Sequence, residues 1–260
     1  MNVKEEAIIG IVGGMGPQAG LALFNSILRH TPANIDQQHL STILMSFPGH
    51  IVDRTAFLEG DELVNPAFAI AAVIRKLESA GATIAGIACN TTYSPSIYNV
   101  ILDDLDRTGS TIKLLNMPYE TCRFIKEAHA GVNRVGVMTT NGTYRSGIYT
   151  QLLQRWGYDV VVPDYSFQNE VIHRMIYDRE FGLKACPMDA TVEARSLADK
   201  AFRFFKSRKC DLIILGCTDL TPIGNECNKN DMVLVDSTDS LARALVRLAL
   251  PVQTKASPAF

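Results

Sequence analysis

Residues 84–92 read Ile-Ala-Gly-Ile-Ala-Cys-Asn-Thr-Thr, an apolar run that ends in a cysteine and three small polar residues. A second stretch of this kind, residues 212–219, reads Leu-Ile-Ile-Leu-Gly-Cys-Thr-Asp. Each pattern is typical of a buried strand that carries a thiol at its carboxyl end. Ligands of open α/β sheets bind at that end of the strands. The sequence therefore predicts a site with a reactive sulfur, Cys89 or Cys217, on each side of a small molecule.

The rest of the chain alternates short apolar runs with amphipathic segments, which predicts parallel sheets joined by right-handed helical crossovers. Since Cys89 and Cys217 lie about half a chain length apart, we expect two similar α/β domains that face each other across a cleft. The first is expected at 1–116, completed by the helix 237–250, and the second at 117–230. The expected strands are 7–12, 41–46, 83–88, 111–116, 134–139, 158–162, 211–215 and 232–235. The helices expected after residue 140 are one through Trp156 and those at 169–181, 188–206 and 237–250.

Composition excludes several classes of partner. The net charge of −2 gives no electrostatic attraction to nucleic acid or to an anionic membrane. No apolar run approaches the roughly 20 residues of a membrane helix, and the first residues do not form a signal peptide. The six cysteines show no spacing typical of a metal site. We therefore expect a cytoplasmic protein with reduced thiols, no metal, and a small molecule as its partner.

Two loops are candidates for binding that small molecule. The turn 13–17, Gly-Gly-Met-Gly-Pro, either packs a strand tightly against a helix or offers backbone N–H groups to an anion. It is not a dinucleotide fingerprint, so a small carboxylate is the favoured anion. In the loop 47–54, Arg54 either binds a carboxylate of the substrate or forms a surface ion pair with Asp53 or a nearby acid, and position alone favours the ion pair. His50 in the same loop is equally consistent with a solvated histidine.

Two facing thiols suit the inversion of a stereocentre. One thiolate removes a proton from carbon and the other thiol returns a proton to the opposite face, so their protonation states must differ. Polar groups beside the cysteines, Asn90, Thr91 and Thr92 on one side and Thr218 on the other, could stabilise the charge that develops on the substrate. The alternative is that these residues form turns and helix caps.

Several motifs together make the chain resemble the aspartate/glutamate racemase family. They are residues 9–17 (IGIVGGMGP), 53–55 (DRT), 89–92 (CNTT), Thr143 with 146–149 (SGIY), 176–178 (IYD) and 215–219 (LGCTD). The resemblance implies two Rossmann-like domains related by pseudo-twofold symmetry, an active site between them, and a homodimer. It also implies amino-acid racemisation without pyridoxal phosphate or another cofactor, with Cys89 and Cys217 as the acid/base pair. The substrate contacts it implies are Met15, His50, Arg54, Asn90, Thr91, Thr92, Thr143, Lys184, Thr218 and Asp219.

This sequence departs from the family pattern at three places that bear on the substrate. Thr92 and Tyr93 stand where the family has a small residue and histidine, and Asp219 replaces a glutamate. Lys184 is the candidate for a lysine that meets a substrate carboxylate, with Arg174 or Arg179 as alternatives. We expect a racemase of aspartate or glutamate. The alternatives are a cysteine-dependent isomerase or decarboxylase of a dicarboxylic acid and a non-catalytic protein that binds a small carboxylate.

Overall fold

The computed structural model describes residues 7–223 and 232–250. The strands, all within two residues of the expected stretches, are β1 Ile9–Gly13, β2 Thr42–Ser46, β3 Ile84–Ile87, β4 Lys113–Leu115, β5 Arg134–Met138, β6 Asp159–Val161, β7 Leu212–Leu215 and β8 Val233–Asp236. The helices are α1 Pro17–His30, α2 Arg54–Glu59, α3 Ala67–Ser79, α4 Pro95–Arg107, α5 Met117–Ala128, α6 Asn141–Ser146, α7 Ile148–Arg155, α8 Tyr165–Phe167, α9 Arg174–Tyr177, α10 Val192–Ser207 and α12 Ser237–Ala249. Within these ranges, no helix is long and apolar enough to cross a membrane.

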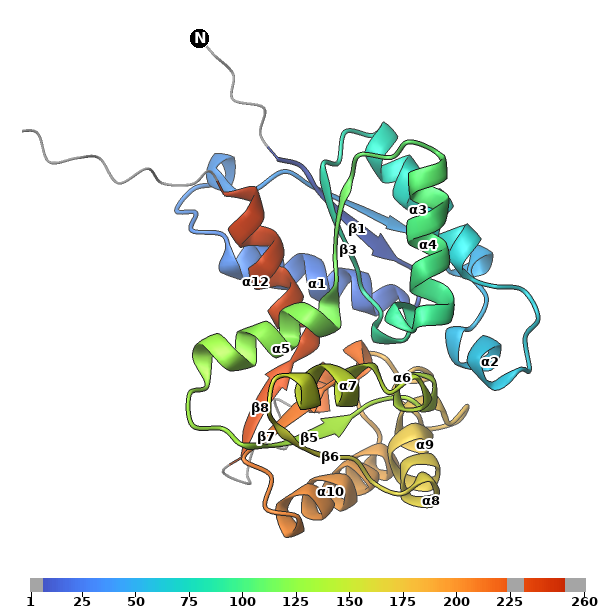
Figure 1. The fold of residues 1–260 in the computed structure, drawn as a ribbon, viewed down its shortest axis with the longest axis vertical. Coiled ribbons are helices and arrows are strands. Elements are labelled where there is room, and N and C mark those ends of the chain that lie inside the picture. Colours follow the sequence, from blue (N-terminus) through green and yellow to red (C-terminus); the bar gives the residue numbers. More distant parts are fainter. Residues whose placement is uncertain (1–6, 224–231, 251–260) are drawn as a thin grey trace, which may run out of the picture.

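The described residues form two four-stranded parallel sheets with the same strand order (Figure 1). The first sheet runs β2-β1-β3-β4 and the second runs β6-β5-β7-β8. The registers also correspond, since Ile9 of β1 lies opposite residues of β2 and β3, and Val135 of β5 lies opposite residues of β6 and β7. The parallel α/β fold predicted from the alternating pattern is therefore confirmed.

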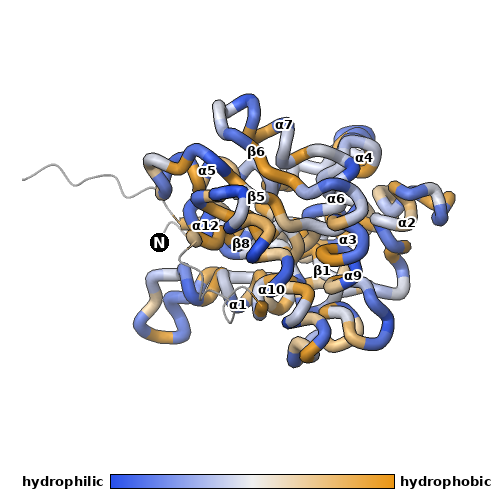
Figure 2. The backbone as a smooth tube through the Cα atoms, turned by 90° about the horizontal axis from the view of Figure 1, so that it is seen from below, coloured by the Kyte–Doolittle hydropathy of each residue, from blue (hydrophilic) through white to orange (hydrophobic). Residues whose placement is uncertain are grey.

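Helices cover both faces of each sheet. On the first sheet α3 and α4 pack together on one side, and α1 and α12 pack together on the other. The second sheet has a core with α5 and α7 on one face and a core with α10 on the other. Figure 2 shows hydrophobic stretches along the strands inside the molecule and hydrophilic stretches at the outer turns. Below, the first sheet with α1–α4 and α12 is called the first unit, and the second sheet with α5–α10 is called the second unit.

The chain crosses between the units twice. It leaves the first unit between β4 and α5, at residues 115–117, and returns between β8 and α12, at residues 236–237. The last strand, β8, pairs with β7 and so extends the second sheet beyond residue 230. Helix α12 lies in the core of the first unit. The division of the chain into two domains with the stated boundaries remains a prediction.

Four local expectations differ from the structure, each for an identifiable reason. Arg54, expected in a loop, begins α2 because the Asp53 carboxylate caps the helix by accepting from Thr55 N and Ala56 N. The helix expected through Trp156 is split because Gly147 adopts a left-handed conformation. The helix expected to reach residue 181 ends at α9, since Asp178 turns its side chain back to accept from the next backbone N–H groups. The helix expected from residue 188 begins at Val192, where Thr191 caps it.

Helix α12 supplies a direct test of the packing in the first unit. Leu245 is fully buried, and its Cδ1 would lie 3.0 Å from a Cβ at Gly86, so the strand and the helix are in close contact. We expect Leu245→Ala to lower the free energy of unfolding by about 2–5 kcal/mol, because a cavity replaces the side chain. Leu248→Ala is the matched control, since Leu248 on the same helix is 36% exposed and should cost much less. Urea denaturation measures the free energy of unfolding of both variants. An equal decrease in the two variants would contradict this packing.

Candidate active site

The two cysteines occupy equivalent positions in the two sheets. Cys89 follows β3 and precedes the 3₁₀ turn Asn90–Tyr93, while Cys217 follows β7 and precedes the 3₁₀ turn Thr218–Leu220. Each of the two residues is 7% exposed, and both line one small cavity of about 10 Å³ between the units. This volume holds about one water molecule. An amino acid therefore enters only if the units or the lining side chains move apart.

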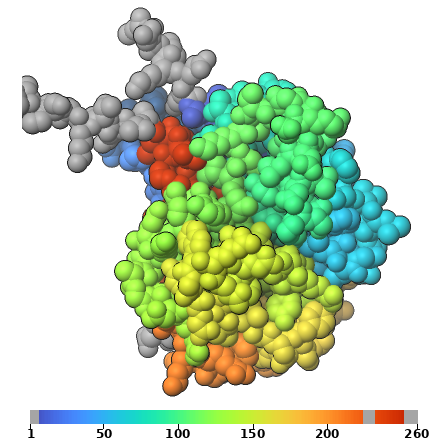
Figure 3. All heavy atoms as spheres, in the orientation of Figure 1, coloured from blue at the N-terminus to red at the C-terminus, as the bar shows by residue number. Residues whose placement is uncertain are grey.

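The cavity brings together most of the side chains expected at the site. Besides the two cysteines, its lining includes Met15, Arg54, Asn90, Thr91, Lys184 and Thr218 from the expected set. A larger pocket of about 250 Å³ lies outside it and shares Met15, Arg54 and Lys184 with the cavity. These three side chains thus stand between the open pocket and the thiols. In Figure 3 the two units are in direct contact on the face shown.

The environment of Cys89 favours the thiolate. Burial raises the pKa of the Cys89 thiol, but the positive charges of Arg54 and Lys184 and hydrogen bonds from Thr92 together outweigh burial and hold this pKa below its usual range. A thiolate is both a better nucleophile and a better base than a thiol. The lowered pKa therefore increases the share of Cys89 that is thiolate and able to accept a proton.

The environment of Cys217 favours the neutral thiol. Burial raises the pKa of the Cys217 thiol well above its usual range, and the negative charge of Asp219 raises it further. Cys217 Sγ donates to Asp219 Oδ2 over 3.5 Å, and the same oxygen accepts from Lys184 Nζ at 2.7 Å. The pKa values of the two thiols are thus shifted in opposite directions, as a two-base mechanism requires.

Arg54 is a buried cation whose hydrogen-bonding capacity is only partly used. It is 6% exposed, and it donates to Met15 O at 3.0 Å and to Val52 O at 3.2 Å. Its Nε has no hydrogen-bond partner among the residues that the structure describes. The surface ion pair favoured on sequence position is wrong, because Arg54 is buried and Asp53 caps α2. The guanidinium is left facing the cavity, where it suits a carboxylate.

Lys184 is the second cation of the cavity. Burial lowers the pKa of the Lys184 ammonium, but the Asp219 carboxylate together with the Cys217 and Tyr177 side chains outweighs burial and holds this pKa above its usual range. The alternatives Arg174 and Arg179 are both exposed, and Arg174 pairs with Asp178. Of the three candidates for the substrate-binding cation of the second unit, only Lys184 lines the cavity.

The polar residues after Cys89 are held in a buried network that spans both units. Asn90 accepts from Tyr149 Oη at 2.6 Å and donates to Ser237 Oγ at 2.9 Å. Thr91 Oγ1 lies 3.1 Å from Thr140 Oγ1 and 3.0 Å from Thr143 Oγ1. These contacts fix Asn90 and Thr91 beside the cysteine, so these residues do more than form a turn.

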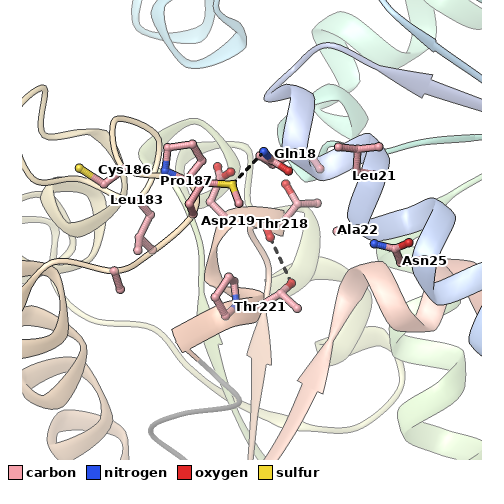
Figure 4. A pocket seen from close by; sticks show the side chains of 14 residues that line it. Gln18, Leu21, Ala22, Asn25, Leu183, Cys186, Pro187, Thr218, Asp219 and Thr221 are labelled. Atoms are coloured by element: carbon pink, nitrogen blue, oxygen red, sulfur yellow. Dashed lines mark hydrogen bonds between the residues drawn. The ribbon is translucent and has the colours of Figure 1, made fainter.

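The remaining expected residues lie at different distances from the cavity. Thr92 donates to Met15 Sδ at 3.4 Å and Thr143 reaches the site through Thr91, but neither lines the cavity. Asp219 lines the open pocket, and also a further pocket of about 180 Å³ between α1 and residues 183–190 (Figure 4). His50 is exposed beside Phe47 and lines none of these pockets. His50 therefore does not belong to the group of side chains around the two cysteines.

Three lining residues, Tyr177, Thr140 and Gly216, were not among the expected contacts, although Gly216 directly precedes Cys217. Tyr177 lies in a motif shared with the family, 176–178, and that resemblance was the signal available for it. Thr140 follows β5 as Cys89 follows β3, so its position at a strand end was the available signal. No three His, Cys, Asp or Glu side chains within 7–223 and 232–250 are grouped as a metal site requires.

The opposite shifts of the two thiols predict the pH dependence of any reaction that needs a Cys89 thiolate and a Cys217 thiol. The rate rises as Cys89 ionises, and its lowered pKa places this limb below the usual range of a cysteine. The rate falls only when Cys217 ionises, and its raised pKa moves that limb to high pH. We expect a broad, bell-shaped dependence of kcat/KM on pH. Asp219→Asn should move the alkaline limb to lower pH, and an unmoved limb would contradict the role of Asp219.

The chain is similar to amino-acid racemases in sequence and fold. A family model described as Asp/Glu/Hydantoin racemase matches residues 12–245. The broad specificity amino-acid racemase RacX of Bacillus subtilis (strain 168) is 24% identical over 253 residues, which are 95% of this chain and 100% of that protein. Picrophilus torridus aspartate racemase is 29% identical and superposes with a TM-score of 0.76 over 94% of each chain. Glutamate racemase from Francisella tularensis subsp. tularensis SCHU S4, in complex with D-glutamate, shares the fold with a TM-score of 0.65 and 18% identity, over 94% of this chain and 81% of that one.

Proposed function

Since the chain belongs to the Asp/Glu/hydantoin racemase family, and is thus an amino-acid racemase, we propose that it inverts the α-carbon of aspartate or glutamate by proton transfer between Cys89 and Cys217. The observation that carries this proposal is the pair of thiols on one cavity, one with a lowered pKa and the other with a raised pKa. Aspartate is the first choice of substrate, because the similar protein of Picrophilus torridus is named an aspartate racemase.

In the proposed reaction, Cys89 Sγ takes the α-proton from one face of the substrate and becomes a thiol. Cys217 Sγ gives its proton to the opposite face of the same carbon and becomes a thiolate. The α-carbon passes through a state with negative charge shared with its carboxylate, which oriented donors and cations must stabilise. Lys184, Thr91 and Thr218 line the cavity and are proposed for this task. The reverse reaction starts from the Cys217 thiolate and the Cys89 thiol. Only protons move in either direction, so nothing is oxidised or reduced.

The preference for an acidic substrate is proposed from the charges of the cavity. Lys184 is already paired with Asp219, whereas Arg54 Nε lacks a hydrogen-bond partner in the described part of the chain. Arg54 can therefore bind the side-chain carboxylate of the substrate without first giving up a protein carboxylate. Met15, Asn90, Thr92, Thr143 and Asp219 are proposed to line or support the bound amino acid.

A substrate panel tests this proposal. The purified protein, with a reducing agent and no cofactor, is incubated separately with both enantiomers of aspartate, glutamate, alanine and arginine, and inversion is followed by chiral chromatography. We expect inversion of an acidic pair at a kcat/KM at least about tenfold above that of the neutral and basic pairs. Inversion of alanine or arginine with equal kcat/KM would support broad specificity and contradict the assignment to Arg54.

We also propose that the protein acts as a homodimer in the reducing cytoplasm. The family resemblance supports the homodimer, and a reaction that needs two free thiols supports the reducing compartment. Sedimentation equilibrium tests the dimer, and a monomer at the concentration of the activity assay would contradict it.

A further inference from the structure

We propose that Tyr177 is a positioning residue that links the two units over the closed site and sets the relative positions of the two cations, Arg54 and Lys184. The proposal rests on the proposed racemase function for its kinetic consequences. Its structural consequence, a link between the units, stands without any substrate.

Tyr177 contacts the two residues that flank Arg54 and also contacts Lys184 itself. Its hydroxyl lies 3.0 Å from Asp53 Oδ2, to which it donates, and 3.3 Å from Thr55 Oγ1. Asp53 and Thr55 are the sequence neighbours of Arg54 in the first unit, and Asp53 caps the helix that Arg54 begins. Lys184 Nζ lies over the ring of Tyr177, in the second unit, 5.1 Å from the ring centroid. A cation over an aromatic ring is attracted by the ring's electrons, so the ring helps to place Lys184.

The Tyr177 contact lies where it can govern opening of the site. The chain crosses between the units at 115–117 and 236–237, beside α5 and α12. Figure 1 shows α2 and α9, which flank the contact, on the opposite side of the molecule from α5 and α12. Units joined by two crossings open most at the edge far from them, because the crossings act as the hinge. The hydrogen bond from Tyr177 to Asp53 must therefore break when the units separate to admit an amino acid.

The surroundings of Tyr177 hold its ring in one place. His173 stacks on the ring with the centroids 4.4 Å apart and the planes 25° from parallel. His173 Nδ1 in turn accepts from the backbone N–H of Asn141 at 3.3 Å. The hydroxyl is thus presented to Asp53 by a ring that is itself fixed, as a positioning residue requires.

A second observation shows how closely the units approach at this edge. Helix α6 of the second unit packs on α2 of the first unit. A Cβ at Gly142 of α6 would lie 2.7 Å from Thr91 Cγ2 and 2.8 Å from Thr55 Oγ1. Both atoms belong to the first unit, so only glycine permits this approach. The added methyl group of Gly142→Ala should therefore hold the units apart sterically. It should oppose closure at the same edge where loss of the Tyr177 hydroxyl does.

The test compares Tyr177→Phe, which keeps the ring but removes the hydroxyl, with Tyr144→Phe. Tyr144 is the matched control because its hydroxyl donates to Pro163 O within the second unit, at 3.0 Å. We expect Tyr177→Phe to raise the KM for the acidic substrate by about tenfold, with kcat changed less than about threefold. The reason is that the ligand-free variant is then expected to be mostly open, so that substrate must supply the free energy of closure and binds with a lower apparent affinity to the same closed state. Gly142→Ala should raise KM in the same way.

Hydrogen exchange of the ligand-free protein separates this proposal from the proposed function. Amides of α2, Arg54–Glu59, should exchange at least about fivefold faster in Tyr177→Phe and in Gly142→Ala than in the wild type or in Tyr144→Phe. Unchanged α2 exchange in Tyr177→Phe would overturn the link, whether or not the protein racemises aspartate. A fall in kcat at constant KM would also overturn it, because the hydroxyl would then act in the chemical step. Faster α2 exchange in a protein that inverts no acidic amino acid would support the link and reject the proposed function.

Discussion

Replacing either Cys89 or Cys217 by serine is expected to lower the kcat of racemisation by about 10³-fold. A serine hydroxyl ionises far above neutral pH, so the Cys89→Ser variant lacks a base for the α-proton and the Cys217→Ser variant has only a poor proton donor. The loss should appear in kcat rather than in KM, since a hydroxyl differs little from a thiol in size and both cysteines act on the reacting carbon. Steady-state kinetics in both directions with aspartate measure the two constants.

Cys186→Ser is the matched control for both substitutions. Cys186 is partly exposed and lines the outer pocket of Figure 4, away from the cavity of the two thiols. It should keep nearly full activity. Retention of more than a tenth of wild-type kcat in either active-site variant, or an equal loss in the control, would contradict the assignment of the acid/base pair.

The second large effect is expected at Arg54. Arg54→Gln removes the positive charge proposed for the side-chain carboxylate of the substrate, and we expect kcat/KM for aspartate to fall by about 10²-fold. Arg54→Lys keeps the charge but loses the planar pair of donors, so its loss should be intermediate. Arg174→Gln is the control, because Arg174 is an exposed arginine of the second unit that pairs with Asp178.

Arg54 should also affect the pH dependence, which a purely structural role would not. The guanidinium lowers the pKa of Cys89 against the effect of burial, so its removal raises that pKa. The acidic limb of the kcat/KM profile should therefore move to higher pH in Arg54→Gln and stay nearly in place in Arg54→Lys. A normal profile in Arg54→Gln would show that Arg54 does not govern the ionisation of Cys89.

The fold was predictable from sequence because its signals are local. Every strand is a short run rich in apolar residues, and the two runs that lead to a cysteine occupy equivalent positions in the two sheets. Helix boundaries were harder, because single side chains decide them. Asp53 starts α2 with its cap, Gly147 splits one helix, and Asp178 ends α9 early. Such effects depend on side-chain geometry that periodicity does not contain.

The site residues that are adjacent in the sequence could be predicted, whereas the contacts between the two units could not. Cys89, Asn90 and Thr91 follow directly from one strand end, but their partners Tyr149 and Thr140 lie about 50 or more residues away. The burial of Arg54 against Met15 is equally non-local, which is why position alone favoured a surface ion pair. His50 shows the converse, since a place in the right loop did not bring its side chain to the cavity.

The most direct test of the two-thiol mechanism is α-hydrogen exchange in deuterium oxide, followed by proton NMR on L-aspartate and on D-aspartate with the Cys217→Ser and Cys89→Ser variants. With only Cys89 as base, the first variant should exchange the α-hydrogen of one enantiomer without inverting it and leave the other nearly untouched. The second variant should show the opposite preference, though more slowly, because Cys217 favours the thiol. Exchange of both enantiomers at similar rates by a single variant would contradict the account, since one base would then reach both faces of the α-carbon.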